Sequence, residues 1–317
     1  MSVTESQTIH SVAAPVFHNI LVATDFSDAS RRAVSEAVAL AAENHAQVSV
    51  VHVAHNDWRY ESLDNPPQLD LERIDAQMQL ESSIHEVRPE QNIRTILIKH
   101  GPAAEAIAKV ARENAADLLV LGTRGRGGLP KLALGSVAEQ ALRIAPCPVI
   151  TVGPQSEIPV RADGSHPILF ATDFDSASTK ALPLALAIAR NRQARLILIH
   201  MMMPIPATST SLSAYVPAAA GADELEEWQG SWRQRTVQKL KDFLPSDTGL
   251  AEEPEFLVGT DFLSEGILAA AERRKAGLIV MGATRKGMPR VSAHFPWSAV
   301  HEVVRYATCP VLTVAEK

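Results

Sequence analysis

The chain contains two copies of one sequence, and this duplication limits its architecture more than any other feature. The residues from His18 to His52 repeat from His166 to His200 without a gap, and both copies contain the run Ala-Thr-Asp-Phe. The similarity returns late in each half, where Ser136 to Val152 matches Ser298 to Val314. A period of about half the chain is far beyond the range of solenoid repeats, so each copy is predicted to be a complete domain.

Domain boundaries follow from the repeat. We expect a disordered tail at residues 1–16, a first domain at 17–153, a polar linker at 154–165 and a second domain at 166–315. The 317 residues are 46% hydrophobic, which is enough for each half to bury a core of its own.

Composition limits the classes of partner. A formal net charge of -6 gives no general attraction to nucleic acid or to an anionic membrane, so neither is expected as the main partner. No apolar run approaches the length that spans a bilayer and the start lacks a signal-peptide pattern, which favours a cytoplasmic protein. The two cysteines, Cys147 and Cys309, occupy equivalent positions, so we expect reduced, buried thiols rather than a disulfide.

Short apolar or β-branched runs alternate with segments of helical periodicity in each half. This pattern is typical of βαβ units, and right-handed crossovers then place helices on both faces of a parallel sheet. The predicted fold class is α/β, with two tandem Rossmann-like, doubly wound, five-stranded sheets. Strands are predicted at 19–24, 47–53, 94–99, 117–122 and 148–152, and at 167–172, 195–201, 255–259, 278–282 and 310–314.

Helices are predicted between these strands from apolar residues at helical spacing. The clearest lie at 29–44 and 103–113, and a second helix of each half is expected at 69–85 and 223–243. The segment 204–222 is rich in Pro, Ser, Thr and Ala and has no periodicity, so we expect a mobile loop, with a lid as the alternative.

Two loops of unusual composition follow strands of the first half. One is 23–27, and the other runs from 122 to 136 with five glycines. Glycines allow close backbone approach, and a helix that begins at the end of the second loop directs free N–H groups outward, so the pair predicts a phosphate-binding site. Arg124, Arg126 and Lys131 add cationic side chains that can pair with phosphate oxygens.

The second loop has the pattern Gly122-x2-Gly125-x9-Gly135-Ser136, which is neither a P-loop nor a G-x-G-x-x-G motif. In this it resembles the universal stress protein (UspA-like) family, whose ATP-binding members carry the pattern after the fourth strand. The resemblance covers nearly the whole chain twice. It implies the adenine nucleotide alpha hydrolase-like fold, and it is also carried by the segments 20–27, 115–122 and 145–152.

The resemblance implies a site for ATP with Mg2+ in the first domain, and no catalytic or metal-ligating side chains. The residues implied at the adenosine end are Ala23, Asp25 and Val53, with Leu121 behind, and those implied around the phosphates are Gly122, Arg124, Gly125, Gly135, Ser136 and Val137. The alternative is that Asp25 only caps the following helix and the glycines form an empty turn.

The second half departs from this pattern. Arg285 replaces the second glycine, Trp297 stands at the position of Gly135, and the loop is two residues longer. A Trp at the helix start takes the space that a phosphate needs, so we expect one nucleotide site per chain. Asp173, the counterpart of Asp25, is present in the second half, and we expect it to cap the following helix.

Two histidines and two tryptophans are further candidates for a functional role. His52 and His200 end equivalent strands but have no spaced metal-ligand partners, so structural roles are expected. Trp228 and Trp232 are expected to pack against the domain, and an exposed pair would instead indicate an interface.

Three functions are compatible with these features. The first is an ATP-binding regulatory protein of the stress response with an unidentified protein partner. The others are a slow ATP hydrolase, for which no positioned base beyond Asp25 is evident, and a nucleotide-independent interaction scaffold. The resemblance also implies that the strands at 148–152 and 310–314 pair within the chain as an intramolecular pseudo-dimer, while a homodimer of whole chains stays an open question.

Overall fold

The computed structural model describes residues 16–53, 78, 93–98, 101–125, 134–156, 164–202, 222–284 and 297–316, with the backbone alone at 95–98, 222–229 and 297. Several sequence predictions lie outside the described residues. They are the tail at 1–15, the helix at 69–85 except for residue 78, the middle of the linker at 157–163, the insertion at 204–221, and the side chains of Arg126, Lys131, Arg285 and Trp297.

Within the described residues, the strands of both halves form one continuous sheet. The N-terminal half contributes β1 (Asn19–Ala23), β2 (Gln47–Val53), β3 (Ile93–Ile98), β4 (Leu118–Gly122) and β5 (Val149–Val152). The C-terminal half contributes β6 (Ile168–Ala171), β7 (Leu196–Met201), β8 (Glu255–Gly259), β9 (Leu278–Ala283) and β10 (Val311–Ala315).

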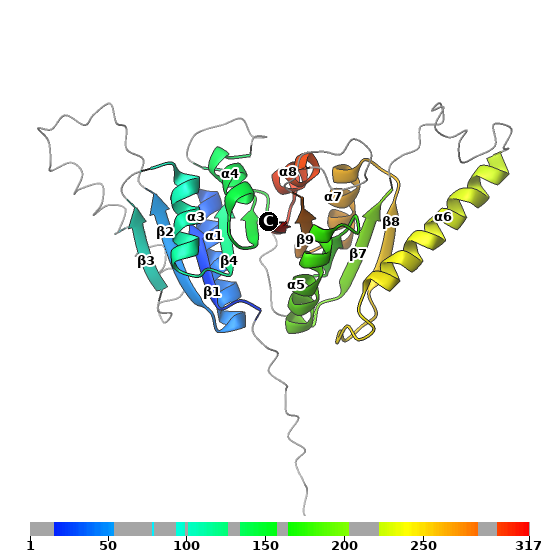
Figure 1. Ribbon diagram of the computed structural model, residues 1–317, viewed down its shortest axis with the longest axis horizontal. Helices are drawn as coiled ribbons and strands as arrows, with labels where there is room; N and C mark the ends of the chain where they lie inside the picture. Colours follow the sequence, from blue (N-terminus) through cyan, green and yellow to red (C-terminus); the bar gives the residue numbers. More distant parts are fainter. Residues whose placement is uncertain are drawn as a thin grey trace, which may run out of the picture.

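The order of the sheet, β3-β2-β1-β4-β5-β10-β9-β6-β7-β8, repeats one topology on either side of its centre. All neighbours within a half are parallel, whereas β5 and β10 are antiparallel. The two halves therefore lie side by side and the last strand ends in the middle of the molecule (Figure 1). The predicted pairing of the last strands within one chain is confirmed by this register.

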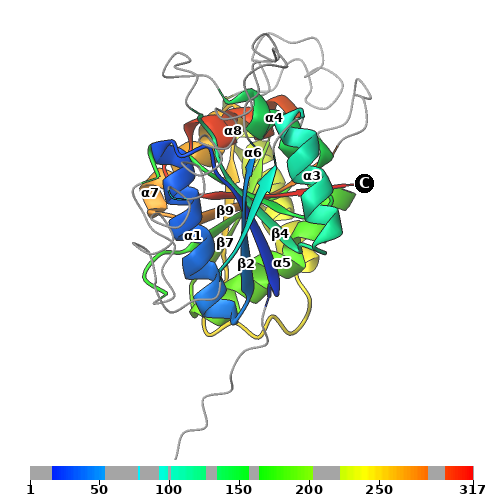
Figure 2. The ribbon, with the colours of Figure 1, turned by 90° about the vertical axis from the view of Figure 1, so that its left-hand side faces the viewer.

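Helices cover both faces of the sheet. They are α1 (Asp28–Asn44), α3 (Ala103–Glu113), α4 (Ser136–Ile144), α5 (Ser176–Arg192), α6 (Ala222–Phe243), α7 (Leu263–Arg274) and α8 (Trp297–Tyr306). One apolar core joins α1, α5 and α6 to one face, and a second joins α3, α4, α7 and α8 to the other. Figure 2 shows α1 and α3 on opposite sides of the N-terminal strands. The predicted doubly wound fold is confirmed.

The first helix of each half has the same local signals in sequence. Ser27 caps α1 by accepting a hydrogen bond from the Ser30 N–H at 3.3 Å, and Asp175 caps α5 in the same way through the Ser178 N–H at 2.7 Å. Both helices end at a residue in the left-handed region, with φ of 52°. Buried alanines on each helix allow close packing on the sheet.

The predicted strands agree with the observed ones to within one or two residues at each end. Neither cysteine forms a disulfide, but only Cys309 is fully buried, and burial raises the pKa of its thiol to about 12. Cys147 is half-buried, so the prediction of a buried thiol was wrong for this residue.

Candidate functional site

The strand order reverses between β1 and β4, so the carboxyl ends of these two strands form the topological switch point of the N-terminal half. The two strands pair directly, with Ala23 opposite Leu121, while β2 lies on the far side of β1 and β5 on the far side of β4. Connections leave these ends toward opposite faces of the sheet. In open α/β sheets this is the place where ligands bind.

Asp25 lies in the turn that follows β1, and its carboxylate supports that turn. Its Oδ1 accepts a hydrogen bond from the Ser27 N–H at 3.0 Å, and the next residue, Phe26, has a φ of 64°. The cap of α1 is Ser27 and not Asp25. The alternative in which Asp25 is the helix cap is therefore wrong.

The loop after β4 lies directly against this turn. The Ser27 hydroxyl donates to the backbone carbonyl of Arg124 at 3.1 Å. A Cβ added at Gly125 would lie 2.6 Å from Oδ2 of Asp25, so a side chain at this position would displace the carboxylate. The structure thus brings Asp25, Arg124 and Gly125 together from two separate loops.

The start of α4 completes this edge of the sheet. Gly135 is the N-cap residue, it makes no side-chain cap hydrogen bond, and its N–H donates to the Thr123 carbonyl at 2.8 Å. Ser136 and Val137, in the first turn, are exposed. The first N–H groups of a helix have no partner within it and lie at the positive end of the helix dipole, where an anion can bind them.

Gly122 has a different role from the other two glycines. A Cβ at this position would lie 2.7 Å from the Ala29 carbonyl carbon and 2.8 Å from the Ser30 nitrogen, both in α1. Gly282 of β9 has the same relation to α5, with backbone atoms of Ala177 and Ser178 at 2.4 Å. Close packing of helix on strand accounts for glycine here in both halves.

The three apolar residues predicted at the adenosine end belong to one core. Ala23 and Leu121 are buried in the core that β1 and β4 share with α3 and α4, and Val53 at the end of β2 packs against the same core. The polar groups of the two loops therefore follow strand ends that are anchored in an apolar core.

The equivalent edge in the C-terminal half is built from different residues. Asp175, which corresponds to Ser27, caps α5 and also accepts a hydrogen bond from the hydroxyl of Thr284. Asp173 accepts from the Asp175 N–H at 3.2 Å and from the Ser178 hydroxyl at 2.8 Å. Helix capping was thus the wrong role for Asp173, because Asp175 lies two residues closer to the helix and takes the Ser178 N–H first.

Negative charge accumulates around Asp175. Burial by itself raises the pKa of Asp175, but hydrogen bonds from Ser178 and Thr284 outweigh burial and lower it below its ordinary value. A hydrogen bond from the Ser176 hydroxyl, 2.6 Å long, lowers the pKa of the nearby Glu316. Both carboxylates are therefore ionised at neutral pH. Lys180, with Nζ 3.6 Å from Oε1 of Glu316, offsets the charge of Glu316, so Asp175 is the carboxylate that opposes the approach of an anion.

Sequence reasoning missed the parts played by Ser27, Thr123 and Asp175. The signal was present in the aligned copies, because Asp175 is the first residue after the shared Ala-Thr-Asp-Phe run and differs from Ser27. Thr123 carries no such signal, since it acts through its backbone carbonyl.

The two histidines have structural roles, as predicted. Nδ1 of His52 lies 2.8 Å from the Thr24 carbonyl, and Nδ1 of His200 lies 2.7 Å from the Thr172 carbonyl, so each ties the ends of two strands together. Trp232 on α6 is 39% exposed, and the side chain of Trp228 lies outside the described residues.

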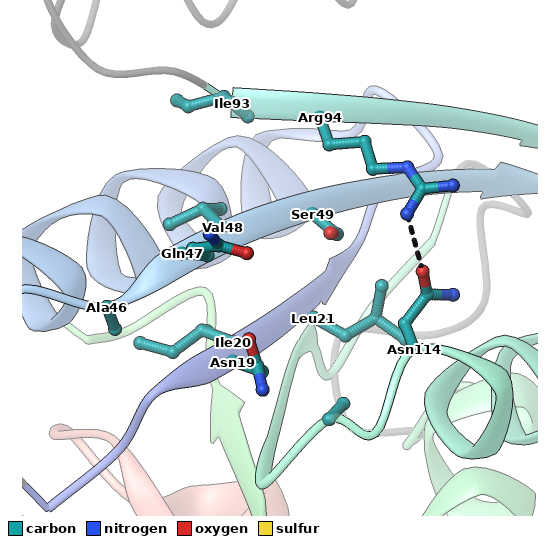
Figure 3. A pocket seen from close by; sticks show the side chains of 11 residues that line it. Asn19, Ile20, Leu21, Ala46, Gln47, Val48, Ser49, Ile93, Arg94 and Asn114 are labelled. Atoms are coloured by element: carbon teal, nitrogen blue, oxygen red, sulfur yellow. Dashed lines mark hydrogen bonds between the residues drawn. The ribbon is translucent and has the colours of Figure 1, made fainter.

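A cavity of about 540 Å³ lies at the opposite edge of the N-terminal half, where β1, β2 and β3 begin (Figure 3). Arg94 donates a hydrogen bond to the Asn114 amide oxygen at 3.1 Å on its wall, beside Ser49. None of the residues predicted for the nucleotide lines it.

The described residues include neither a metal-binding cluster nor a membrane-spanning helix. They contain no group of three His, Cys, Asp or Glu side chains placed to hold a metal ion. In the same part of the chain, no helix has the length and apolar character needed to cross a bilayer.

Comparison with known proteins gives matches to each half and to the whole chain. The family model for the universal stress protein family matches residues 17–153 and 164–315. Universal stress protein MJ0531 of Methanocaldococcus jannaschii is 32% identical over 43% of this chain and 82% of its own length, and universal stress protein YxiE of Bacillus subtilis is 31% identical over 43% of this chain and 99% of its own. A universal stress protein from Archaeoglobus fulgidus has the same fold across 94% of this chain and 98% of that one, with a TM-score of 0.62 and 18% identity. This chain therefore belongs to the universal stress protein family and contains two domains of that family in tandem.

Proposed function

We propose that the N-terminal domain binds ATP at the carboxyl ends of β1 and β4 and that this binding regulates the protein in a stress response. The observation that supports it most directly is the start of α4, which has glycine at the N-cap and no side-chain cap beside the Asp25 turn. Phosphate oxygens can accept hydrogen bonds from the exposed N–H groups of this turn. Mg2+ would arrive on the phosphates and keep its waters, as this ion commonly does.

The proposal gives each end of the nucleotide a different surface. Asp25 accepts hydrogen bonds from ribose hydroxyls or from the base, and the adenosine rests against Ala23, Leu121 and Val53. The loop from Gly122 to Gly125, with Arg124, contacts the phosphates together with Gly135, Ser136 and Val137. Binding and orientation are the roles of these residues, and no proton transfer is assigned to Asp25.

The proposal is limited to one nucleotide per chain. In the C-terminal domain, Asp175 contacts Thr284 in the loop after β9, which corresponds to Arg124 in the loop after β4. A carboxylate where phosphate would bind raises the energy of the bound state by like-charge repulsion. In addition, the sequence has Trp297 at the position of Gly135.

A calorimetric titration of ATP with Mg2+ into nucleotide-free protein tests the proposal. We expect saturation near one ATP per chain, and loss of binding in a Gly135→Trp variant. Asp25→Ala should weaken binding by about 10- to 100-fold, because a hydrogen bond to a charged group contributes about 1.5–3 kcal/mol.

Asp173→Ala is the matched control. It removes a carboxylate from the same turn of the other domain, where two hydrogen bonds are lost, and it should leave ATP affinity unchanged. Equal weakening by the two substitutions would contradict a single site. Absence of binding to the parent protein would exclude ATP regulation and favour the interaction scaffold.

A further inference from the structure

The seam between the two halves is almost symmetric. In the antiparallel pair of β5 and β10, Ile150 lies opposite Leu312, and the aligned repeats make these two residues equivalent. Thr151 lies opposite Val311 and Val149 opposite Thr313. An approximate two-fold axis therefore passes between Ile150 and Leu312. A residue near this axis contacts residues of the other half that are equivalent to itself or to its own neighbours.

The apolar part of this seam does not distinguish one half from the other. Ile150 and Leu312 are both fully buried, and the strands around them carry Val and Thr in the same order in both copies. A second N-terminal half presents nearly the same apolar surface as a C-terminal half. Selection between partners must then come from polar contacts across the seam.

The first such contact joins α4 to α8, which lie on either side of the seam (Figure 1). Oε2 of Glu139 is 3.7 Å from Nε2 of His301, and the alignment makes these residues equivalent. Two N-terminal halves paired in this geometry would place Glu139 against a second Glu139. Two carboxylates at this distance repel, although Arg143, 2.8 Å from Oε1 of Glu139, offsets part of the charge, whereas a carboxylate and an imidazole do not repel.

The second contact is deeper and joins the ends of α1 and α5. Oε2 of Glu43 accepts a hydrogen bond from Nε of Arg192 at 3.0 Å, and the side chains are 13% and 5% exposed. Glu43 corresponds to Asn191 in the other copy, and Arg192 corresponds to Asn44. In a pair of N-terminal halves, Glu43 would be buried against the side-chain amide of Asn44. In a pair of C-terminal halves, Arg192 would be buried against the side-chain amide of Asn191.

This ion pair adds little to stability, which is the expected property of a specificity contact. Burial raises the pKa of Glu43 in spite of the lowering effect of Arg192, so the carboxylate is desolvated more than it is compensated. In addition, Nη2 of Arg192 is buried with no hydrogen-bond partner among the described residues. Either charge without the other is more unfavourable than the pair, because a buried charge then lacks any counter-charge.

We propose that these two contacts make the seam selective, so that an N-terminal half accepts a C-terminal half of this chain and rejects a second N-terminal half. The partner that fits the seam carries Arg and His at the positions of Arg192 and His301. The duplication has thereby separated two surfaces that were once alike. The C-terminal half of a chain is therefore not displaced from the seam by the N-terminal half of another chain.

A cysteine reporter in the full chain tests this directly. Ile150→Cys, in a background with Cys147→Ala and Cys309→Ala, places one thiol on the axis, and its only route to a disulfide is the pairing of two N-terminal halves. With the native charges we expect the chain to remain uncrosslinked under oxidising conditions. Adding Arg192→Glu places two carboxylates at the seam of the fused pair, so the fraction of interchain disulfide should rise at least fivefold, although Glu139 still opposes its own counterpart.

The charge reversal Glu43→Arg with Arg192→Glu separates selectivity from general damage. It restores an ion pair of opposite polarity, so the crosslink should fall at least fivefold from the level of the single substitution and the unfolding temperature should recover. A crosslink in the native-charge reporter would overturn the proposal. So would the absence of a crosslink with Arg192→Glu, or a reversal that fails to lower it. If the single variant does not fold, recovery of folding in the reversed pair decides the matter in the same way.

Discussion

The loops that follow β4 and β9 occupy equivalent places in the two domains, but side chains of different charge contact them. In the N-terminal domain, a serine hydroxyl donates to the carbonyl of Arg124, and Gly125 lies against Asp25. In the C-terminal domain, the carboxylate of Asp175 accepts from the hydroxyl of Thr284. The turn that contacts the loop after β9 thus supplies a carboxylate, whereas the equivalent turn beside the loop after β4 supplies a neutral hydroxyl.

The comparison separates two kinds of glycine. Gly122 and Gly282 remain in both copies because a Cβ would meet the backbone of α1 or α5. Gly125 and Gly135 have been replaced in the C-terminal copy by Arg285 and Trp297. Glycines needed for packing are thus present twice, whereas those that would serve a ligand are present once.

The largest effect should come from the packing glycines. Gly282→Ala and Gly122→Ala each force a methyl group against helix backbone, which cannot rotate away, and overpacking of this kind costs about 1–3 kcal/mol. The loss should be greater at Gly282, where the contacts are shorter. Urea unfolding of each variant measures it. If Gly122→Ala destabilised the protein and Gly282→Ala did not, the shared packing role would be refuted.

A smaller effect should follow from copying the acidic cap into the N-terminal domain. Ser27→Asp keeps a good N-cap but adds a carboxylate beside the Arg124 carbonyl, so ATP affinity should fall about 10-fold, or about 1.4 kcal/mol. Ser27→Asn supplies a neutral cap of similar quality and should retain most of the affinity. Calorimetry on both variants isolates the charge, and equal affinities would show that charge does not separate the two sites.

Gly125→Ala should reduce affinity without reducing stability. The methyl group would meet Oδ2 of Asp25, which is the end of a side chain and can move, so unfolding should be almost unchanged. The displaced carboxylate should weaken ATP binding by about 3- to 10-fold, or about 0.7–1.4 kcal/mol. The same urea and calorimetric measurements apply. Loss of stability with unchanged affinity would place Gly125 among the packing glycines.

The smallest effect should be a pH dependence that arises in the C-terminal domain. Burial lowers the pKa of His200, the hydrogen bond to Thr172 opposes this, and the charge of Lys239 lowers the pKa further. The unfolded chain therefore binds more protons than the folded one below about pH 6.5, and the contribution of His200 to stability is lost as pH falls from there. Thermal unfolding between pH 7.5 and 5 should show a shallower decline for His200→Gln. An unchanged profile would exclude this histidine as the source.

Much of the fold and part of the site could be predicted because they depend on residues that lie close together in the sequence. Alternation of apolar runs located the strands, and the glycine spacing after β4 identified a loop that does meet Asp25 in space. The role of Asp173 was predicted incorrectly because capping depends on which of two nearby carboxylates reaches the helix N–H. That choice depends on the turn through Phe174, with a φ of 65°, which periodicity does not report.

By itself, the sequence determined that this protein is two copies of one α/β domain with a glycine-rich loop in only the first, since repeats, periodicity and glycine spacing are properties of the chain. Only the tertiary structure decided why Gly122 is glycine, which aspartate caps α5, and that Glu43 and Arg192 meet across the seam. Each of these depends on atoms brought within a few ångströms by packing, and equivalent positions in two aligned copies do not reveal which of them will touch.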